Sequence, residues 1–300
     1  MTGVYNEPME YLELEGELPE LRKPTFIVAF RGWNDAGRAA TIAVRHLVKS
    51  WDAKRFASID PEEFFDFTVT RPQIRVTDEG QRDLRWPRNR FYYHKQDEDG
   101  EDVVMFIGTE PHLKWRTFSN TIRSLYERLD GQRLLTLGAL VAATTHRRPP
   151  PVTGFSTEED LAKRLEGLTI SRTRYEGPTG IVGALHDAWR RNGLAAASLW
   201  VGLPPYLGDA INPQGALALL LELDKLFAFA PDLAKAEEAS RDFVKQVDDA
   251  LVQNDEMRMY LAELEQRIDS GVVGAGTPDL PPAGDLMGDL EAYLRKHRQG

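Results

Sequence analysis

Short apolar runs alternate with longer amphipathic segments along most of this 300-residue chain. Runs rich in β-branched and aromatic residues predict buried strands at 25–30, 55–59, 103–108, 133–141 and 195–203. Apolar positions spaced by three and four predict helices at 36–51, 117–129, 179–191 and 214–229. Strands separated by helix-length segments are typical of a mostly parallel sheet covered on both faces. The pattern therefore predicts a three-layer α/β/α sandwich over about residues 20–230.

Residues 67–94 interrupt this alternation. Apolar and polar residues alternate on both sides of a turn at 78–80, which predicts a β-hairpin inserted into the α/β core. Six arginines and several aromatic residues interleave there, a combination that can bind nucleic acid. The alternative is a hairpin whose arginines face a neighbouring subunit, and the net charge of −10 favours it. The interface candidates are Arg71, Arg75, Arg85 and Trp86, with Trp86 buried.

The C-terminal part has helical periodicity. From 232 to 269 the apolar positions step by three and four without a break, with the polar residues Ser240 and Asn254 on the same seam. This spacing predicts one long helix, paired with a helix of its own chain or with one of a second chain. Residues 271–283 have linker composition, and 285–297 can form an amphipathic helix. We therefore expect a core domain at 20–230, a helical appendage at 231–270, and a linker with a terminal helix at 271–300.

Two glycine-bearing blocks, 29–41 and 175–185, indicate where a site would lie. In each, a turn leads into a helix-patterned segment, and helix N-termini offer unpaired N–H groups to an anion. Open α/β sheets bind ligands at the carboxyl ends of their strands, so we expect the two blocks to be neighbours there. The catalytic candidates are Glu110, His146 and Glu176. The ligand-binding candidates are Asn34, Asp35, Gly37, Arg147, Gly177, Gly180 and Tyr206.

Four of the candidates also have a purely structural interpretation. Asp35 can be a helix N-cap, and we favour that role for it. Glu176 can stabilise the N-terminus of the helix that follows it. Glu110 precedes a proline and can simply end a strand. His146 lies beside two arginines, so we favour a solvated loop histidine over a catalytic one.

Composition excludes several classes of function. The chain has no cysteine, which rules out disulfides and thiolate catalysis. Its six histidines have no metal-ligand spacing, so we expect neither a metal nor a cofactor. The acidic charge disfavours nucleic acid and anionic membranes as partners. The acidic start and the lack of a long apolar run predict a cytoplasmic protein. No GxSxG elbow or Walker phosphate loop occurs.

Several sequence motifs of this chain resemble those of the bacterial branch of the proteasome assembly chaperone 2 family. They are GWNDAG at 32–37, RPQIR at 71–75, WP at 86–87, IGTEPHLKW at 107–115, LGALVA at 137–142, RPPPVTG at 148–154, YEGPTGIVG at 175–183 and SLWVGLPPY at 198–206. The resemblance implies a phosphorylase/hydrolase-like α/β/α fold. Eukaryotic relatives act as chaperones in proteasome assembly, which implies a non-enzymatic protein-interaction or assembly factor. The fold leaves open a small-molecule hydrolase or phosphorylase acting on a nucleoside-like substrate. Threefold assemblies are frequent among relatives of this fold, so we expect a homo-oligomer, a trimer first.

Overall fold

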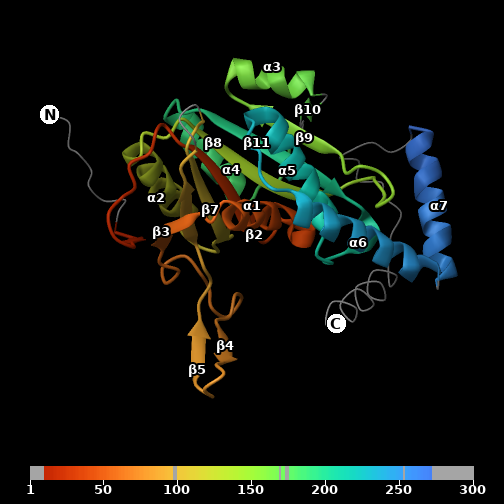
Figure 1. Ribbon diagram of the computed structural model, residues 1–300, viewed down its shortest axis with the longest axis horizontal. Coiled ribbons are helices and arrows are strands. Elements are labelled where there is room, and N and C mark those ends of the chain that lie inside the picture. Colours follow the sequence, from red (N-terminus) through yellow and green to blue (C-terminus); the bar gives the residue numbers. More distant parts are fainter. Residues whose placement is uncertain (1–9, 97–99, 169, 173–175, 253, 272–300) are drawn as a thin grey trace.

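The computed structural model describes residues 10–96, 100–168, 170–172, 176–252 and 254–271. Within them, one mixed sheet runs through the molecule in the order β1-β3-β6-β7-β2-β8-β11-β9-β10 (Figure 1). Its strands are β1 (Leu12–Leu14), β2 (Thr25–Arg31), β3 (Lys54–Ile59), β6 (Arg90–His94), β7 (Val103–Thr109), β8 (Arg133–Val141), β9 (Val152–Ser156), β10 (Ser171–Arg172) and β11 (Ala196–Leu203).

The four strands β7, β2, β8 and β11 lie side by side and parallel at the centre. Ala29 of β2 pairs with Ile107 of β7 on one side and with Leu137 of β8 on the other. The β2 side chains from Thr25 to Phe30 are all buried, as expected for a strand covered on both faces. The carboxyl ends of these strands meet at one edge, which positions the candidate site.

Helices cover both faces of the sheet. Three of them, α1 (Ala39–Ser50), α3 (Glu159–Gly167) and α5 (Pro213–Phe227), pack on one face. The other face is covered by α2 (Trp115–Arg128) and α4 (Ile181–Arg191). The predicted α/β fold is therefore confirmed. Ser156 lies ahead of α3, where its hydroxyl accepts the Glu158 N–H at 3.0 Å.

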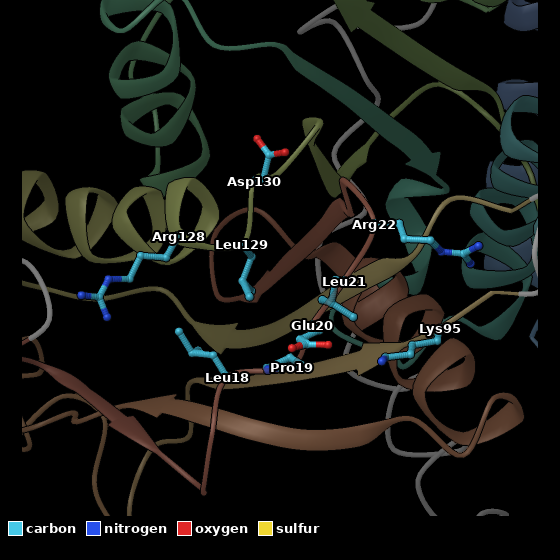
Figure 2. Close-up of a pocket in the computed structure, with 9 residues that line it drawn as sticks. All are labelled: Leu18, Pro19, Glu20, Leu21, Arg22, Lys95, Arg128, Leu129 and Asp130. Carbon is cyan, nitrogen blue, oxygen red and sulfur yellow. The ribbon is translucent and has the colours of Figure 1, made fainter.

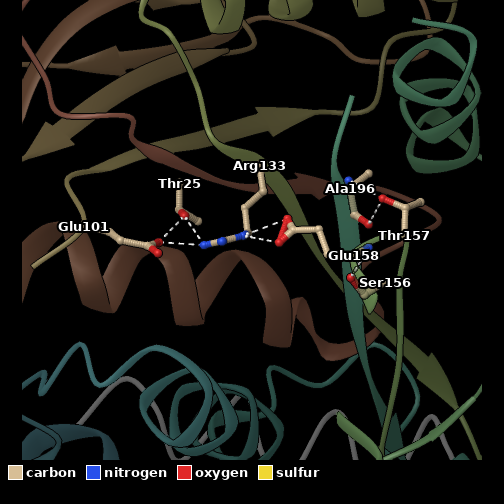
Figure 3. Close-up of polar contacts among 7 residues, drawn as sticks. All are labelled: Thr25, Glu101, Arg133, Ser156, Thr157, Glu158 and Ala196. Carbon is tan, nitrogen blue, oxygen red and sulfur yellow. Dashed lines mark hydrogen bonds and ion pairs between the residues drawn. The ribbon is translucent and has the colours of Figure 1, made fainter. Parts of the chain in front are cut away.

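A buried arginine joins loops at the amino ends of the central strands. The Arg133 guanidinium donates to both carboxylate oxygens of Glu158 at 3.0 Å and to Glu101 at 2.7 Å (Figure 3). It also donates to the Thr25 hydroxyl on β2 at 3.2 Å, and its charge lies 5.6 Å from the centre of the Phe227 ring. Two carboxylates balance the buried cation, so this network ties strand starts together.

The insertion between β3 and β6 forms a separate two-stranded sheet, β4 (Gln73–Val76) with β5 (Arg82–Arg85). It projects away from the central sheet (Figure 1). The predicted hairpin therefore exists, but it does not extend over 67–94, because residues 90–94 form β6 and pair with β3 and β7. In the single chain Trp86 packs edge-on against Phe67 and is 43% exposed, so its expected burial in a subunit contact stays a prediction.

The C-terminal part differs from the predicted single helix. It consists of two helices, α6 (Ala234–Val252) and α7 (Asp255–Asp269). Asn254 lies outside both and accepts the Met257 N–H at 3.0 Å, so it caps α7 instead of lying on a continuous seam. α6 packs on α5, and both helices pack on residues that follow β11, around the buried Phe243, Val247 and Leu264. Residues 272–300, with the expected linker and terminal helix, are outside the described residues, and the expected domain boundaries stay a prediction.

Candidate functional site

The two glycine-bearing blocks meet at the carboxyl ends of β2 and β7, through Glu110. This carboxylate accepts the Ile181 N–H at the start of α4 (2.8 Å) and the Asn34 side-chain N–H (2.9 Å) on one oxygen. Its other oxygen accepts the Trp33 N–H at 3.1 Å. Glu110 thus occupies the helix N-terminus, the place where an anionic ligand binds in many α/β proteins. The sequence expectation that Glu110 only ends a strand is incomplete.

Glycines make this close approach possible. A Cβ on Gly180 would lie 2.5 Å from both the Asn34 side-chain nitrogen and a Glu110 oxygen. A Cβ on Gly32 would lie 3.0 Å from the Glu110 Cβ, and Gly32 has a φ of +131°, which side chains rarely adopt. The glycines let two chain segments approach the carboxylate from both sides.

Asp35 serves the neighbouring helix in the same way. It is 5% exposed, and its carboxylate accepts N–H groups from Ala40 (2.8 Å) and Thr41 (3.3 Å) and the Thr41 hydroxyl (2.5 Å). These donors belong to the first residues of α1. Asp35 therefore caps this helix, although it lies four residues ahead of the first residue of the helix. Burial raises the pKa of Asp35 to about 6, against the opposing effect of these hydrogen bonds.

A second polar chain lies where β8 and β11 end. The Tyr206 hydroxyl accepts the His146 backbone N–H (2.8 Å) and lies 2.5 Å from His146 Nδ1. His146 Nε2 is 3.1 Å from Asp248 Oδ1 on α6. One neutral tautomer satisfies both contacts: Nε2–H donates to Asp248, and Nδ1 accepts the tyrosine O–H. The chain therefore links the sheet to the C-terminal helices.

His146 is buried, with 1% of its surface exposed, so the expected solvated loop histidine is wrong. Burial lowers the pKa of His146, although Asp248 opposes the shift, and burial likewise raises the pKa of Tyr206. Arg147 also contacts Asp248, at 3.1 Å, and is thus engaged by an acid of its own chain. Asp248 was not among the candidates, because sequence reasoning placed it only on a helical segment.

The candidates thus fall into separate groups. Asn34, Glu110 and Gly180 lie together at one corner, whereas His146, Arg147 and Tyr206 lie together under α6. Gly37 packs against the buried Asn212, and its carbonyl accepts the Asn212 N–H at 2.8 Å. Glu176 and Gly177 are exposed. Ligand binding and catalysis by these residues stay predictions.

A shallow hollow of about 560 Å³ lies at the opposite edge of the sheet (Figure 2). Leu18–Arg22, Lys95 and Arg128–Asp130 line it, beside the amino ends of the central strands. Its charged side chains point in different directions and do not converge on one point (Figure 2). It therefore lacks the convergent polar groups of a small-molecule site. Among the described residues, no group of three or more His, Asp or Glu side chains is placed to hold a metal, and no helix has the length and apolarity to cross a membrane.

Comparison with known proteins identifies the family. The sequence model of the PAC2 family matches residues 29–251. The chain belongs to the PAC2 family. A PAC2 protein from Streptomyces avermitilis is 38% identical, with a TM-score of 0.70 over 75% of this chain and 95% of its own. A proteasome-assembly chaperone homologue from Mycobacterium tuberculosis is 34% identical, with a TM-score of 0.70 over 79% of this chain and 99% of its own. No match was found among curated proteins.

A second Mycobacterium tuberculosis protein, of unknown function, is 27% identical, with a TM-score of 0.78 over 87% of this chain and 90% of its own. The predicted resemblance to the bacterial branch is therefore confirmed. The TM-scores show that these PAC2 relatives share the fold of this chain over most of its length.

Proposed function

We propose that this PAC2 protein is a non-enzymatic factor that binds other proteins and assists the assembly of a multi-subunit complex. One observation carries the proposal: the Glu110 carboxylate accepts the Ile181 N–H at the N-terminus of α4, together with N–H groups of Trp33 and Asn34 from the loop after β2. A helix N-terminus can offer its N–H groups to an anionic substrate, and here the chain's own acid fills that position. The groups at the N-terminus of α4 are therefore occupied by contacts within the chain itself.

The second polar chain supports the same conclusion. Tyr206 and His146 are 0% and 1% exposed, and α6 covers them through Asp248. A general base must come within hydrogen-bond reach of a substrate proton, and this histidine is already engaged on both ring nitrogens. The arrangement disfavours the nucleoside hydrolase or phosphorylase that the fold left open.

The PAC2 relatives indicate the kind of partner. The relative from Mycobacterium tuberculosis that is 34% identical is described as a proteasome-assembly chaperone homologue. We therefore propose proteasome subunits as the first partners to test. The proposal retains the cytoplasmic location and the homotrimeric state expected from the sequence.

Mixing purified chain with dissociated α and β subunits of its own organism's proteasome tests this function. Native mass spectrometry should detect a complex with one type of subunit, and peptidase activity should appear sooner than without the chain. The Glu110→Gln variant, which retains one oxygen acceptor, should assist assembly as well as the wild type. Absence of any subunit complex would overturn the proposal.

The same preparations distinguish the enzymatic alternative. Wild type and Glu110→Gln are incubated with a panel of nucleosides, with and without inorganic phosphate, and base release is followed by chromatography. We expect no release by either protein. Turnover by the wild type that the variant loses would make Glu110 a catalytic base and contradict an assembly role for this corner.

A further inference from the structure

The sheet β4–β5 and its turn, residues 73–85, form an arm with an unusual surface. Seven of the eight side chains of the two strands are exposed, and the eighth is half-buried. Ile74, Val76 and Leu84 are 60%, 68% and 49% exposed. An isolated two-stranded hairpin is marginally stable in water, and exposed apolar clusters mark interaction sites. The arm therefore has the properties of a docking element.

Strand register divides the arm into two different faces. Ile74 pairs with Leu84, and Val76 pairs with Arg82, so these four side chains share one face. Gln73, Arg75, Asp83 and Arg85 share the other, where Arg85 and Asp83 form an ion pair at 2.9 Å. One face is thus apolar with a single cation, whereas the second is polar and partly neutralised.

The base of the arm adds positive charge. Burial lowers the pKa of Arg88, and the nearby charges of Arg90 and Arg85 lower it further. Residues 71–90 contain six arginines and three acids, in a chain whose net charge is −10. Mutually repelling arginines on an acidic protein favour an acidic partner.

The outer face of α7 is apolar and acidic, and so complements the apolar and basic arm. Glu256, Met259 and Glu263 are spaced three and four residues apart on one side of this helix, and all are exposed. Met259 is 74% exposed, the largest exposure among the large hydrophobic side chains. The buried residues Met257, Tyr260 and Leu264 lie on an adjacent side of the helix. Two acids thus flank one exposed apolar side chain.

We propose that the apolar face of the arm in one copy docks on the outer face of α7 in a second copy. Ile74, Val76 and Leu84 cover Met259, while Arg82 and Arg88 pair with Glu256 and Glu263. The two surfaces belong to different parts of the chain, so the contact is heterologous and generates a ring when the rotation closes. The inference rests on the homo-oligomeric part of the proposed function and supplies its contact surface.

Charge reversal tests the contact on both sides. The mass of the assembly is measured by light scattering and analytical ultracentrifugation for the wild type, for Arg82→Glu with Arg88→Glu, and for Glu256→Arg with Glu263→Arg. Each double variant should raise the dissociation constant about tenfold or more and shift the mass toward a monomer. Combining all four substitutions should restore the mass of the wild type. Circular dichroism confirms that each variant folds.

Arg75, an interface candidate from the sequence, lies on the polar face of the arm and outside the proposed contact. Arg75→Glu makes the same change of charge there and is therefore the matched control. It should leave the mass unchanged. The docking proposal fails when reversal at Arg82 and Arg88 leaves the mass intact, when Arg75→Glu alone dissociates the assembly, or when the fourfold variant stays dissociated. A wild type that is monomeric at micromolar concentration would overturn both this contact and the proposed trimer, whereas the assembly role is judged separately by subunit binding.

Discussion

Glu110 and Asp35 are carboxylates that accept the unpaired N–H groups at the N-termini of two helices. Glu110 accepts the first N–H of α4, and Asp35 accepts two N–H groups of α1. Helix N-termini leave unpaired donors, and an acid there is favoured by hydrogen bonding and by the helix dipole. Asp35 lies just ahead of its own helix, whereas Glu110 comes from a distant segment and therefore also fixes where α4 starts relative to the sheet.

The close packing around Glu110 gives a sharp test at residue scale. Gly180→Ala places a methyl group 2.5 Å from Asn34 and Glu110, so we expect a loss of about 1–3 kcal/mol in the free energy of unfolding. Gly167→Ala is the control, because a Cβ there meets no atom within 4 Å. Urea denaturation of both variants measures the difference. Equal stabilities would contradict this, because they would show that Asn34 and Glu110 can move to accommodate a methyl group at position 180 without cost.

The raised pKa of Asp35 makes its contribution to stability depend on pH. Folding raises this pKa from 3.8 to about 6, because burial disfavours the charged form. The native carboxyl keeps its proton between these values while the unfolded one loses it, so stability falls as pH rises through this window. Asp35→Asn lacks this penalty and should gain about 2 kcal/mol relative to the wild type between pH 4 and pH 7. A difference independent of pH, measured by urea denaturation, would contradict the raised pKa.

Local sequence pattern predicted much of this corner, but not its central contact. The turn after β2 was predicted from Gly, Asn and Asp and the turn before α4 from Gly and Pro, and their proximity followed from the sheet topology. The role of Glu110 depends on a side chain that reaches a helix more than 70 positions later in the chain. For His146 the local sequence was misleading. Its two arginine neighbours predicted exposure to solvent, whereas Tyr206 and α6 bury the ring.

At the scale of elements, the apolar spacing of the C-terminal segment predicted which residues are buried but not where the helix ends. Phe243, Val247, Leu261 and Leu264 are all buried, in agreement with the seam. A helix interior and a helix N-cap can both accommodate an asparagine, so spacing alone did not distinguish them. The chain uses Asn254 as a cap, which lets α7 begin in a new direction.

This correction reverses the expected effect of a substitution. On a continuous seam, Asn254→Leu would stabilise the protein by replacing a buried polar group. As a cap, Asn254 accepts the Met257 N–H, so the leucine variant should lose about 0.5–2 kcal/mol. Asn254→Asp keeps an acceptor and should stay within about 0.5 kcal/mol of the wild type. Thermal unfolding distinguishes the two, and a stabilised leucine variant would restore the single-helix interpretation.

At the scale of the whole molecule, the C-terminal helices are joined to the sheet by apolar packing and by the polar chain from Tyr206 through His146 to Asp248. The groups that face the histidine are Tyr206 beside its ring, Asp248 on α6, Arg147 next along the chain and Glu265 on α7. Burial dominates over the attraction of the two acids and lowers the pKa of His146. The neutral ring is therefore the form present when α6 is packed against the sheet, a contact that we call the joint.

This joint should loosen in mild acid. When α6 lifts away, His146 becomes solvated and regains a pKa near its ordinary value of 6.5, so the open form binds a proton that the closed form excludes. The opening free energy then falls as pH decreases below 6.5, until the lowered pKa of the closed form is reached. Asp248, whose pKa is lowered by folding, adds an effect of the same sign only at more acidic pH.

Hydrogen exchange measured between pH 7.5 and 5.5, corrected for intrinsic rates, tests the joint. Protection of amides in α6 and α7 should decrease by up to about tenfold per pH unit below 6.5, whereas amides of β2 should stay constant. His146→Gln can still hydrogen-bond but cannot titrate, so its exchange in α6 and α7 should lose this pH dependence. The same slope in the variant would assign the effect to another group, and an unchanged profile in both proteins would mean that α6 stays closed independently of the histidine.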